Sequence, residues 1–205
     1  KIDKANIIRA VSYRDGAPSS KVYTHSYFID ADHQAKYNLP IISLVTEIKN
    51  LFDDTMGIYN PGIHFENNNP EWTGNYFQKG RDWERPIHIE YFDTNGILKF
   101  NQDAGVRIHG GKTRQAAQKS LRLYARDDYS KNRFNYPILP NTNNNNYKNF
   151  ILRTSMGGWG KTIITDVLCH NIVSDSNIET QDFQPTIVFI NGEYWGIHTI
   201  RDYIN

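Results

Sequence analysis

The chain has 205 residues, and its 23 lysines and arginines nearly balance 22 aspartates and glutamates, for a formal net charge of +1. This length suits one domain with a real core, and the charge balance gives no support to a general nucleic-acid or membrane-surface binder, although a local basic site remains compatible with it. No apolar run approaches the roughly 20 residues that cross a bilayer, and one cysteine, Cys169, allows neither an internal disulfide nor a cysteine-rich zinc site.

The first segment, residues 5–29, has the pattern of two strands around a turn. Asp15, Gly16 and Pro18 supply the turn chemistry. The segment also has a hydrophobic face, for which the main sheet is the obvious cover: Ile7, Val11, Val22 and Tyr27.

The next segment begins with a continuous apolar run, 39–45, which is typical of a buried strand. Residues 47–53 predict a short helix, and 54–80, rich in Asn, Gly and Pro, predict a long loop. Four aromatic side chains in and beside this loop could stack on sugars or plug the sheet, and the second interpretation is favoured: Tyr59, Trp72, Tyr76 and Trp83.

From residue 86 the pattern becomes β. Residues 87–92 and 97–100 flank a turn at 93–96. The stretch 105–126 then predicts strand, glycine turn, strand. Val106 and Ile108 lie on one face and Arg107 and His109 on the other, and Leu121 and Leu123 likewise oppose Ser120 and Arg122. Paired glycines and positive charge suit a phosphate or carboxylate, whereas the alternative is a hairpin with an ordinary solvated basic face.

The second half adds a polar, Asn-rich stretch at 127–148 that predicts a loop without rigidity, and a strand at 150–154. Residues 161–174 change to a helical period. Cys169 within that pattern favours a buried inert thiol, and Asp166 with His170 favours a local hydrogen bond over a catalytic or metal-binding pair. The apolar stripe of the helix comprises Ile163, Ile164, Val167, Leu168 and Ile172.

The chain closes with a strong hairpin signal, strands at 186–190 and 193–200 around Asn191 and Gly192. Residues 157–162 (GGWGKT) are a near miss for a phosphate-binding P-loop, because that motif requires glycine where Ser155 stands. The predicted fold class is α+β, a mainly antiparallel β-sheet with one principal helix.

Together, several segments resemble the spore-coat protein H (CotH-type) kinase family. The resemblance covers 39–205 and is carried by 39–45, 51–53, 57–59, Asn75 with Tyr76, Gly80, 83–86, 90–93, 105–111, Thr113 with Arg114, 119–124, 151–153, Gly157 with Gly158, and 190–196. Residues 1–29 are similar to the last strands of a chitobiase-C-terminal-like β-sandwich that precedes this domain in bacterial surface proteins.

The resemblance implies an extracytoplasmic, secreted or cell-surface bacterial kinase that uses ATP and Mg²⁺ to phosphorylate Ser or Thr of a protein. By analogy with two-lobed kinases the chain is the N-terminal, nucleotide-binding lobe. Catalytic and metal-binding carboxylates are then expected in a C-terminal lobe that this chain lacks, so that the chain alone is expected to be a fragment without activity.

The resemblance also implies roles for individual residues. Gly110 and Gly111 would form the turn over the phosphates, with charge from Arg107 or Arg114. Lys119 would reach the α- and β-phosphates, and Asp166 on the helix would orient it. The alternative function is a non-catalytic surface module that binds a cell-surface glycan or spaces other domains.

Overall fold

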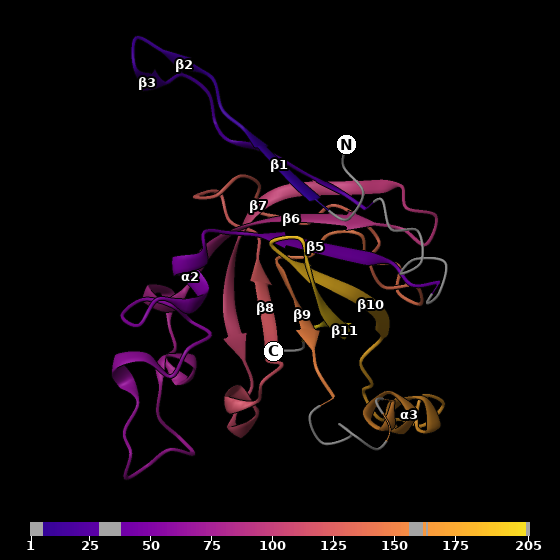
Figure 1. The fold of residues 1–205 in the computed structure, drawn as a ribbon. Helices are drawn as coiled ribbons and strands as arrows, with labels where there is room; N and C mark the ends of the chain where they lie inside the picture. Colours follow the sequence, from indigo (N-terminus) through magenta and orange to yellow (C-terminus); the bar gives the residue numbers. More distant parts are fainter. Residues whose placement is uncertain (1–5, 29–37, 156–161, 163, 204–205) are drawn as a thin grey trace.

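A computed structural model describes residues 6–28, 38–155, 162 and 164–203. Within them, seven strands close into a barrel in the order β10-β11-β9-β8-β7-β6-β5 (Figure 1). Those strands are β5 (Ile41–Val45), β6 (Arg85–Phe92), β7 (Leu98–His109), β8 (Ser120–Tyr124), β9 (Asn149–Arg153), β10 (Phe183–Ile190) and β11 (Glu193–Asp202). The helices are α2 (Ile48–Phe52), α3 (Thr165–Ile172) and the short 3-10 helices η1 (Gly62–His64), η2 (Asn75–Phe77), η3 (Arg81–Trp83) and η4 (Lys112–Gln115).

Barrel closure depends on one parallel pair. β5 pairs with β10 from Ile41 beside Ile187 to Leu44 beside Ile190, whereas the other neighbouring strands of the barrel are antiparallel. The α+β class with a mainly antiparallel sheet is thus confirmed. The sequence prediction had not anticipated that the sheet closes on itself.

The barrel interior is filled by alternate side chains of its strands. Val106 and Ile108 on β7 and Leu121 and Leu123 on β8 are buried, as their period-two pattern predicted. Tyr59 and Tyr76 from the long loop are also buried, so for these two the plugging interpretation is correct.

The loop at 127–148 differs from the sequence prediction. Phe134 and Tyr147 form an isolated bridge, and their side chains are 0% and 2% exposed. The loop is therefore packed into the core despite its asparagines, because a few aromatic side chains within a polar stretch are enough to fix it.

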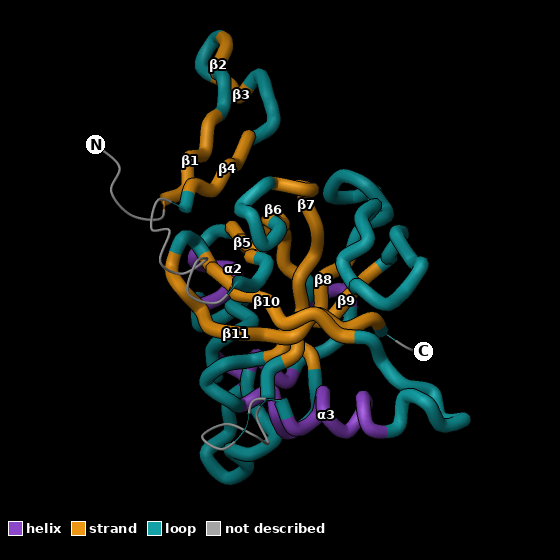
Figure 2. The backbone as a smooth tube through the Cα atoms, turned by 90° about the vertical axis from the view of Figure 1, so that its right-hand side faces the viewer, coloured by secondary structure: helices purple, strands orange, loops and turns teal. Residues whose placement is uncertain are grey.

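An arm precedes the barrel. β1 (Asn6–Ala10) and β4 (Tyr23–Tyr27) pair in a separate two-stranded sheet, and β2 (Tyr13–Arg14) with β3 (Ala17–Pro18) forms the tip, which projects away from the barrel (Figures 1 and 2). The turn at the tip has positive φ angles at Asp15 and Gly16, which agrees with the predicted turn chemistry.

The base of the arm contacts the outside of the barrel. Backbone N–H of Ser26 donates to Glu90 Oε2 at 2.7 Å, and the Ser26 and Ser43 hydroxyls lie 2.7 Å apart. The predicted hydrophobic cover is therefore partly wrong. The covered face of β4 consists of Thr24 and Ser26, while Tyr27 is 47% exposed.

Helix α3 lies at the end of the molecule away from the arm (Figures 1 and 2). Its apolar stripe faces solvent, since Ile164, Leu168 and Ile172 are at least half exposed, and Ile163 lies outside the described residues. Cys169 is also exposed, which corrects the expectation of a buried thiol. The reason is that α3 turns its polar side, with Asp166, toward the sheet. No helix among the described residues is long and apolar enough to cross a membrane.

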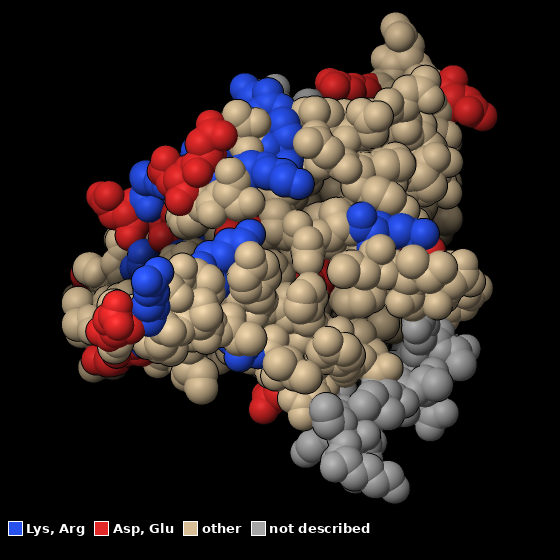
Figure 3. Space-filling view, turned by 90° about the horizontal axis from the view of Figure 1, so that it is seen from above, with Lys and Arg blue, Asp and Glu red and all other residues tan. Residues whose placement is uncertain are grey.

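The charged side chains show no segregation into one dominant sign. Viewed from above, lysines and arginines alternate with acidic residues along one side, and much of the remaining face is uncharged (Figure 3). This distribution agrees with the net charge of +1.

Leu123 provides a test of the barrel core. Leu123→Ala is expected to lower the free energy of unfolding by about 2–5 kcal/mol, because the side chain is 0% exposed and leaves a cavity. Ile97→Ala, at a position 54% exposed, is the matched control and should change it by less than about 0.5 kcal/mol. Urea denaturation measures both, and equal losses would contradict the described core.

Candidate functional site

A cavity of about 390 Å³ lies between the glycine turn and helix α3. Its walls come from the end of β7, the turn, the start of β8, the end of β9 and the first turns of α3. The lining residues are His109, Gly110, Thr113, Ser120, Arg153, Thr154, Ser155, Thr165, Asp166 and Cys169. Antiparallel pairing of β7 with β8 and of β8 with β9 helps to bring these segments together, although His109 and Cys169 are far apart in the sequence.

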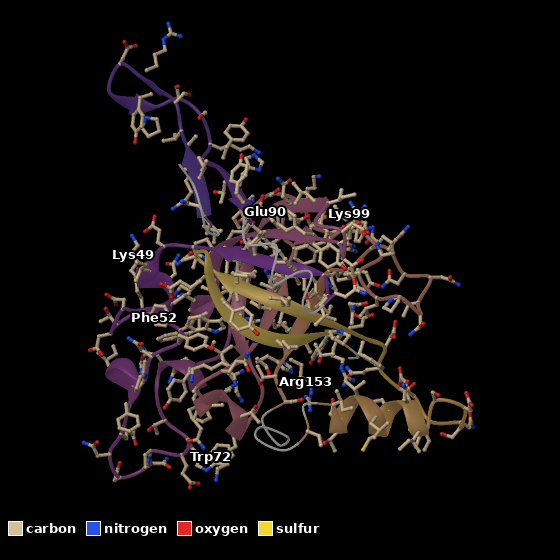
Figure 4. The ribbon with its side chains drawn as sticks, turned by 45° about the vertical axis from the view of Figure 1, so that its right-hand side comes forward. Lys49, Phe52, Trp72, Glu90, Lys99 and Arg153 are labelled. Atoms are coloured by element: carbon tan, nitrogen blue, oxygen red, sulfur yellow. The ribbon has the colours of Figure 1, made fainter. Side chains whose placement is uncertain are left out.

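An ion-pair cluster stands at one wall of this cavity. Arg153 Nη2 lies 3.2 Å from Asp166 Oδ1, and Arg201 donates to Asp166 Oδ2. Arg201 is 1% exposed, whereas the Arg153 side chain is 45% exposed (its position beside α3 is labelled in Figure 4). Burial lowers the pKa of Arg201 below its usual value. Asp166 is therefore anchored from the barrel side, and Arg153 keeps an accessible guanidinium.

The glycine turn is more extended than a tight hairpin. Gly110 has a φ of +118°, and a Cβ there would lie 2.3 Å from Thr113 Oγ1, so only glycine fits. Gly111 has no atom near a hypothetical Cβ and a negative φ. The turn continues through η4, and β8 begins only at Ser120. The predicted strand–turn–strand order is correct, but the connection is long.

Arg114 supports the turn from within. Its Nε donates to the Gly110 carbonyl at 2.6 Å, and Nη1 donates to the carbonyls of Tyr76 and Gln78 at 3.0 and 3.1 Å. The residue is 8% exposed, and burial lowers its pKa. Its described contacts are with backbone, so its guanidinium holds the turn against the long loop.

Lys119 lies one residue before β8 and points to the opposite side from Ser120. Its Nζ donates to the Ala116 carbonyl at 2.8 Å and lies 4.1 Å from the centre of the Tyr76 ring and 5.1 Å from that of Tyr59. The residue is 3% exposed, and burial lowers its pKa to about 8. The described contacts of Lys119 and Asp166 are separate, so the structure does not bring this predicted pair together.

Arg107 belongs to a separate ion-pair cluster, around the buried carboxylate of Glu84. Arg126 binds Glu84 through two bonds of 2.8 and 2.9 Å, Arg107 Nε lies 3.6 Å from it, and Arg81 also donates to it. A Cβ on Gly105 would lie 2.2 Å from Glu84 Oε1. Glycine at 105 is thus required by the close approach of this carboxylate to β7.

His109, at the end of β7, lines the cavity and lies near several arginines. Burial and the nearby Arg122, Arg114 and Arg153 lower its pKa to about 4. A neutral imidazole is therefore present at physiological pH. The surrounding guanidinium groups favour an anion in the cavity.

Two of the predicted site residues, Gly110 and Asp166, line this cavity, whereas Arg107, Gly111, Arg114 and Lys119 do not. Sequence reasoning did not assign a site role to Arg153, although it ends an apolar strand and belongs to one of the segments that carry the family resemblance. The predicted Asp166–His170 contact is replaced by other partners, since His170 Nδ1 accepts from the backbone N–H of Gln181. The near-miss P-loop at 157–161 lies outside the described residues.

The described residues give little support to a sugar-binding surface or to a metal site. Of the four loop aromatics, Trp72 is 54% exposed and packs beside Phe77, so a sugar-stacking surface rests mainly on Trp72. Among the described residues, no group of three or more His, Cys, Asp and Glu side chains could hold a metal ion.

A comparison with known protein families gives a match to the C-terminal part of the chain. Residues 106–205 match the model of the CotH kinase protein family, and this part of the chain belongs to that family. The match begins within β7 and includes the glycine turn, β8, β9, α3 and the final hairpin. No curated protein matches the chain. Family membership supports a kinase-like function.

The depressed pKa of His109 predicts a pH dependence of stability. An unfolded histidine has a pKa near 6.5, so the unfolded state binds a proton that the folded state excludes between pH 6.5 and about 4. Stability is full above pH 6.5 and falls as the pH drops through this window, by at most about 1.4 kcal/mol per unit for one proton.

His109→Gln should flatten this dependence, as measured by urea denaturation at pH 7.0, 5.5 and 4.5. His198, which is fully buried with its pKa also lowered to about 4, contributes a slope that remains in the variant. Parallel curves for the two proteins would contradict the described environment of His109.

Proposed function

We propose that this chain is the nucleotide-binding lobe of a CotH-type kinase and that the cavity between the glycine turn and α3 holds the phosphates of ATP. The single observation that carries the proposal is the meeting of Gly110, Arg153 and Asp166 around one cavity within the family-matched segment. Strand, glycine turn, strand and helix contribute to it in the order expected of a kinase N-terminal lobe.

The groups around the cavity suit phosphate oxygens. Arg153 supplies an accessible guanidinium, which forms charge-assisted hydrogen bonds with phosphate. Thr113, Ser120 and Thr154 add hydroxyl donors, and Gly110 lets the backbone approach closely. Bound Mg·ATP would supply the transferable phosphoryl group and the metal charge that offsets it.

In this proposal the Arg153–Asp166 pair has the role that the family resemblance implied for Lys119 and Asp166. Asp166 is a positioning residue, held by buried Arg201 and in turn orienting Arg153. A phosphate role for Lys119 would require its ammonium group to leave the rings of Tyr59 and Tyr76. The lysine assignment therefore makes a different prediction from the arginine assignment.

The wider biological role follows from the family resemblance. We propose that the intact protein transfers phosphate from ATP to Ser or Thr of a protein substrate outside the cytoplasm of a bacterium. Residues 39–205 would form one lobe, since β5 and β6 share the barrel with the family-matched strands. Residues 1–29 would be the terminal strands of a preceding β-sandwich, an idea supported by the separate β1–β4 sheet.

Mg·ATP titration by calorimetry tests the phosphate site. Arg153→Ala should weaken binding at least roughly tenfold, because it removes a charged hydrogen-bond donor while Arg201 still pairs with Asp166. Lys119→Met should leave the affinity within about twofold if Arg153 carries the role.

Arg133→Ala is the matched control, since this arginine donates to the Asn132 carbonyl and lines a different cavity. Loss of affinity in Lys119→Met with normal binding in Arg153→Ala would restore the lysine assignment. Equal affinity of all four proteins would remove the cavity from nucleotide binding.

A further inference from the structure

A second cavity, of about 340 Å³, lies where the arm meets the barrel. Its walls include His25 and Phe28 after or within β4, Ile41 and Phe92 on the barrel strands, Leu98 at the start of β7, and Glu90 on β6. Its volume falls in the lower range of small-ligand sites. It shares no lining residue with the cavity beside α3.

Glu90 is an unusual residue to find in this place. Its side chain is 1% exposed, although it lies on the outer face of a barrel strand beneath the arm (Figure 4). Oε2 accepts the backbone N–H of Ser26, but Oε1 accepts no hydrogen bond in the described part of the chain. A buried carboxylate with an unfilled oxygen is costly unless a positive group or donor completes it.

The imidazole of His25 lies close to this carboxylate without forming a hydrogen bond to its second oxygen. His25 Nδ1 lies 3.4 Å from Glu90 Oε1, and the His25 side chain is 47% exposed. Among the described residues, no lysine or arginine lines the cavity. The local charge therefore favours a cationic ligand over an anionic one.

The other walls are apolar and aromatic. Phe28 packs against Phe92 with ring centres 5.3 Å apart and against Phe189 at 4.7 Å, which fixes the ring at the cavity wall. Aliphatic walls come from Ile41 and Leu98. Rings attract cations through their faces, and the aliphatic surface suits a short hydrocarbon chain.

We propose that this cavity binds an alkylammonium group, with the ammonium on Glu90 Oε1 and the alkyl chain against Phe28, Ile41 and Leu98. The same chemistry occurs in a free amine and in a lysine side chain of a peptide. Because the site joins β4 to β6, its ligand also stabilises the docked arm. The proposal is independent of the nucleotide site.

Calorimetric titration of the full chain with n-butylammonium chloride tests the charge requirement without any variant. Binding of n-butylammonium, together with at least tenfold weaker binding of 1-butanol and of butyrate, supports the site. The proposal is overturned if the neutral alcohol binds equally well or if butyrate binds more strongly. It is also overturned if n-butylammonium gives no heat of binding up to about 100 mM, which is about the weakest affinity worth assigning to a site. Titration with Nα-acetyl-lysine amide shows whether a lysine residue or a free amine binds more tightly. Tighter binding of either ligand supports the proposal if that binding depends on Glu90.

Glu90→Gln is the critical variant, because the amide oxygen still accepts the Ser26 N–H while the charge is lost. Binding of n-butylammonium should weaken at least roughly tenfold. Asp103→Asn is the matched control, since this carboxylate pairs with His88 on the neighbouring strand and does not line the cavity.

If Glu90→Gln does not fold, Phe28→Leu supplies a second test, because it retains the apolar wall but removes the ring; binding should weaken measurably. Unchanged affinity in whichever of the two variants folds would contradict the assignment, and so would equal weakening in Asp103→Asn.

Discussion

The parallel pairing of β5 with β10 is the constraint on which the rest of this structure depends. It converts a sheet of otherwise antiparallel neighbours into a closed barrel, within which direct pairing places β8 beside β7, β9 beside β8 and β11 beside β9. Arg153 and Arg201 thereby face the same helix, α3, from adjacent strands. The residues around the candidate cavity come from separate parts of the chain that these pairings and α3 bring together.

The lysines and arginines near the barrel end differ in what they contact: several bond to other parts of the protein, and one lines the candidate cavity. Arg107, Arg81 and Arg126 converge on buried Glu84, while Arg114 and Lys119 satisfy backbone carbonyls at the end of the barrel. The buried cations among them, Arg114 and Lys119, need partners because desolvation is costly. Arg153 differs in that its only described partner, Asp166, is itself held by a second arginine. Its place in the lining of the cavity, rather than the density of charge in the sequence, singles out Arg153 in the proposed site.

The N-terminal arm follows the same principle on the other side of the barrel. An isolated two-stranded hairpin is marginal in water, so its position depends on contacts with the sheet. Those contacts are largely polar, between Ser26, Ser43 and Glu90, with Phe28 as the apolar anchor. The buried carboxylate of Glu90 is the charged group at this junction. The family match starts within β7, so this junction lies outside the matched segment.

Much of the secondary structure was predictable from local pattern. The buried strand at 39–45, the turns at Asp15 with Gly16 and at Asn191 with Gly192, and the alternating faces around Val106 and Leu123 all agree with the structure. Period-two alternation and turn chemistry act over a few residues, so a sequence records them directly. The packed loop around Phe134 was less predictable, because its burial depends on distant partners.

The sequence by itself determined the strands, the turns, the fold class and the resemblance to a kinase family. Only the tertiary structure decided which cation faces the cavity, that Cys169 is exposed, and that Glu90 is buried beneath the arm. The physical reason is that side-chain burial and ion pairing are set by elements far apart in the chain. Lys119 and Arg153 are both cations in or beside a β-strand, and what distinguishes them is their neighbours, the rings of the long loop for Lys119 and Asp166 of α3 for Arg153.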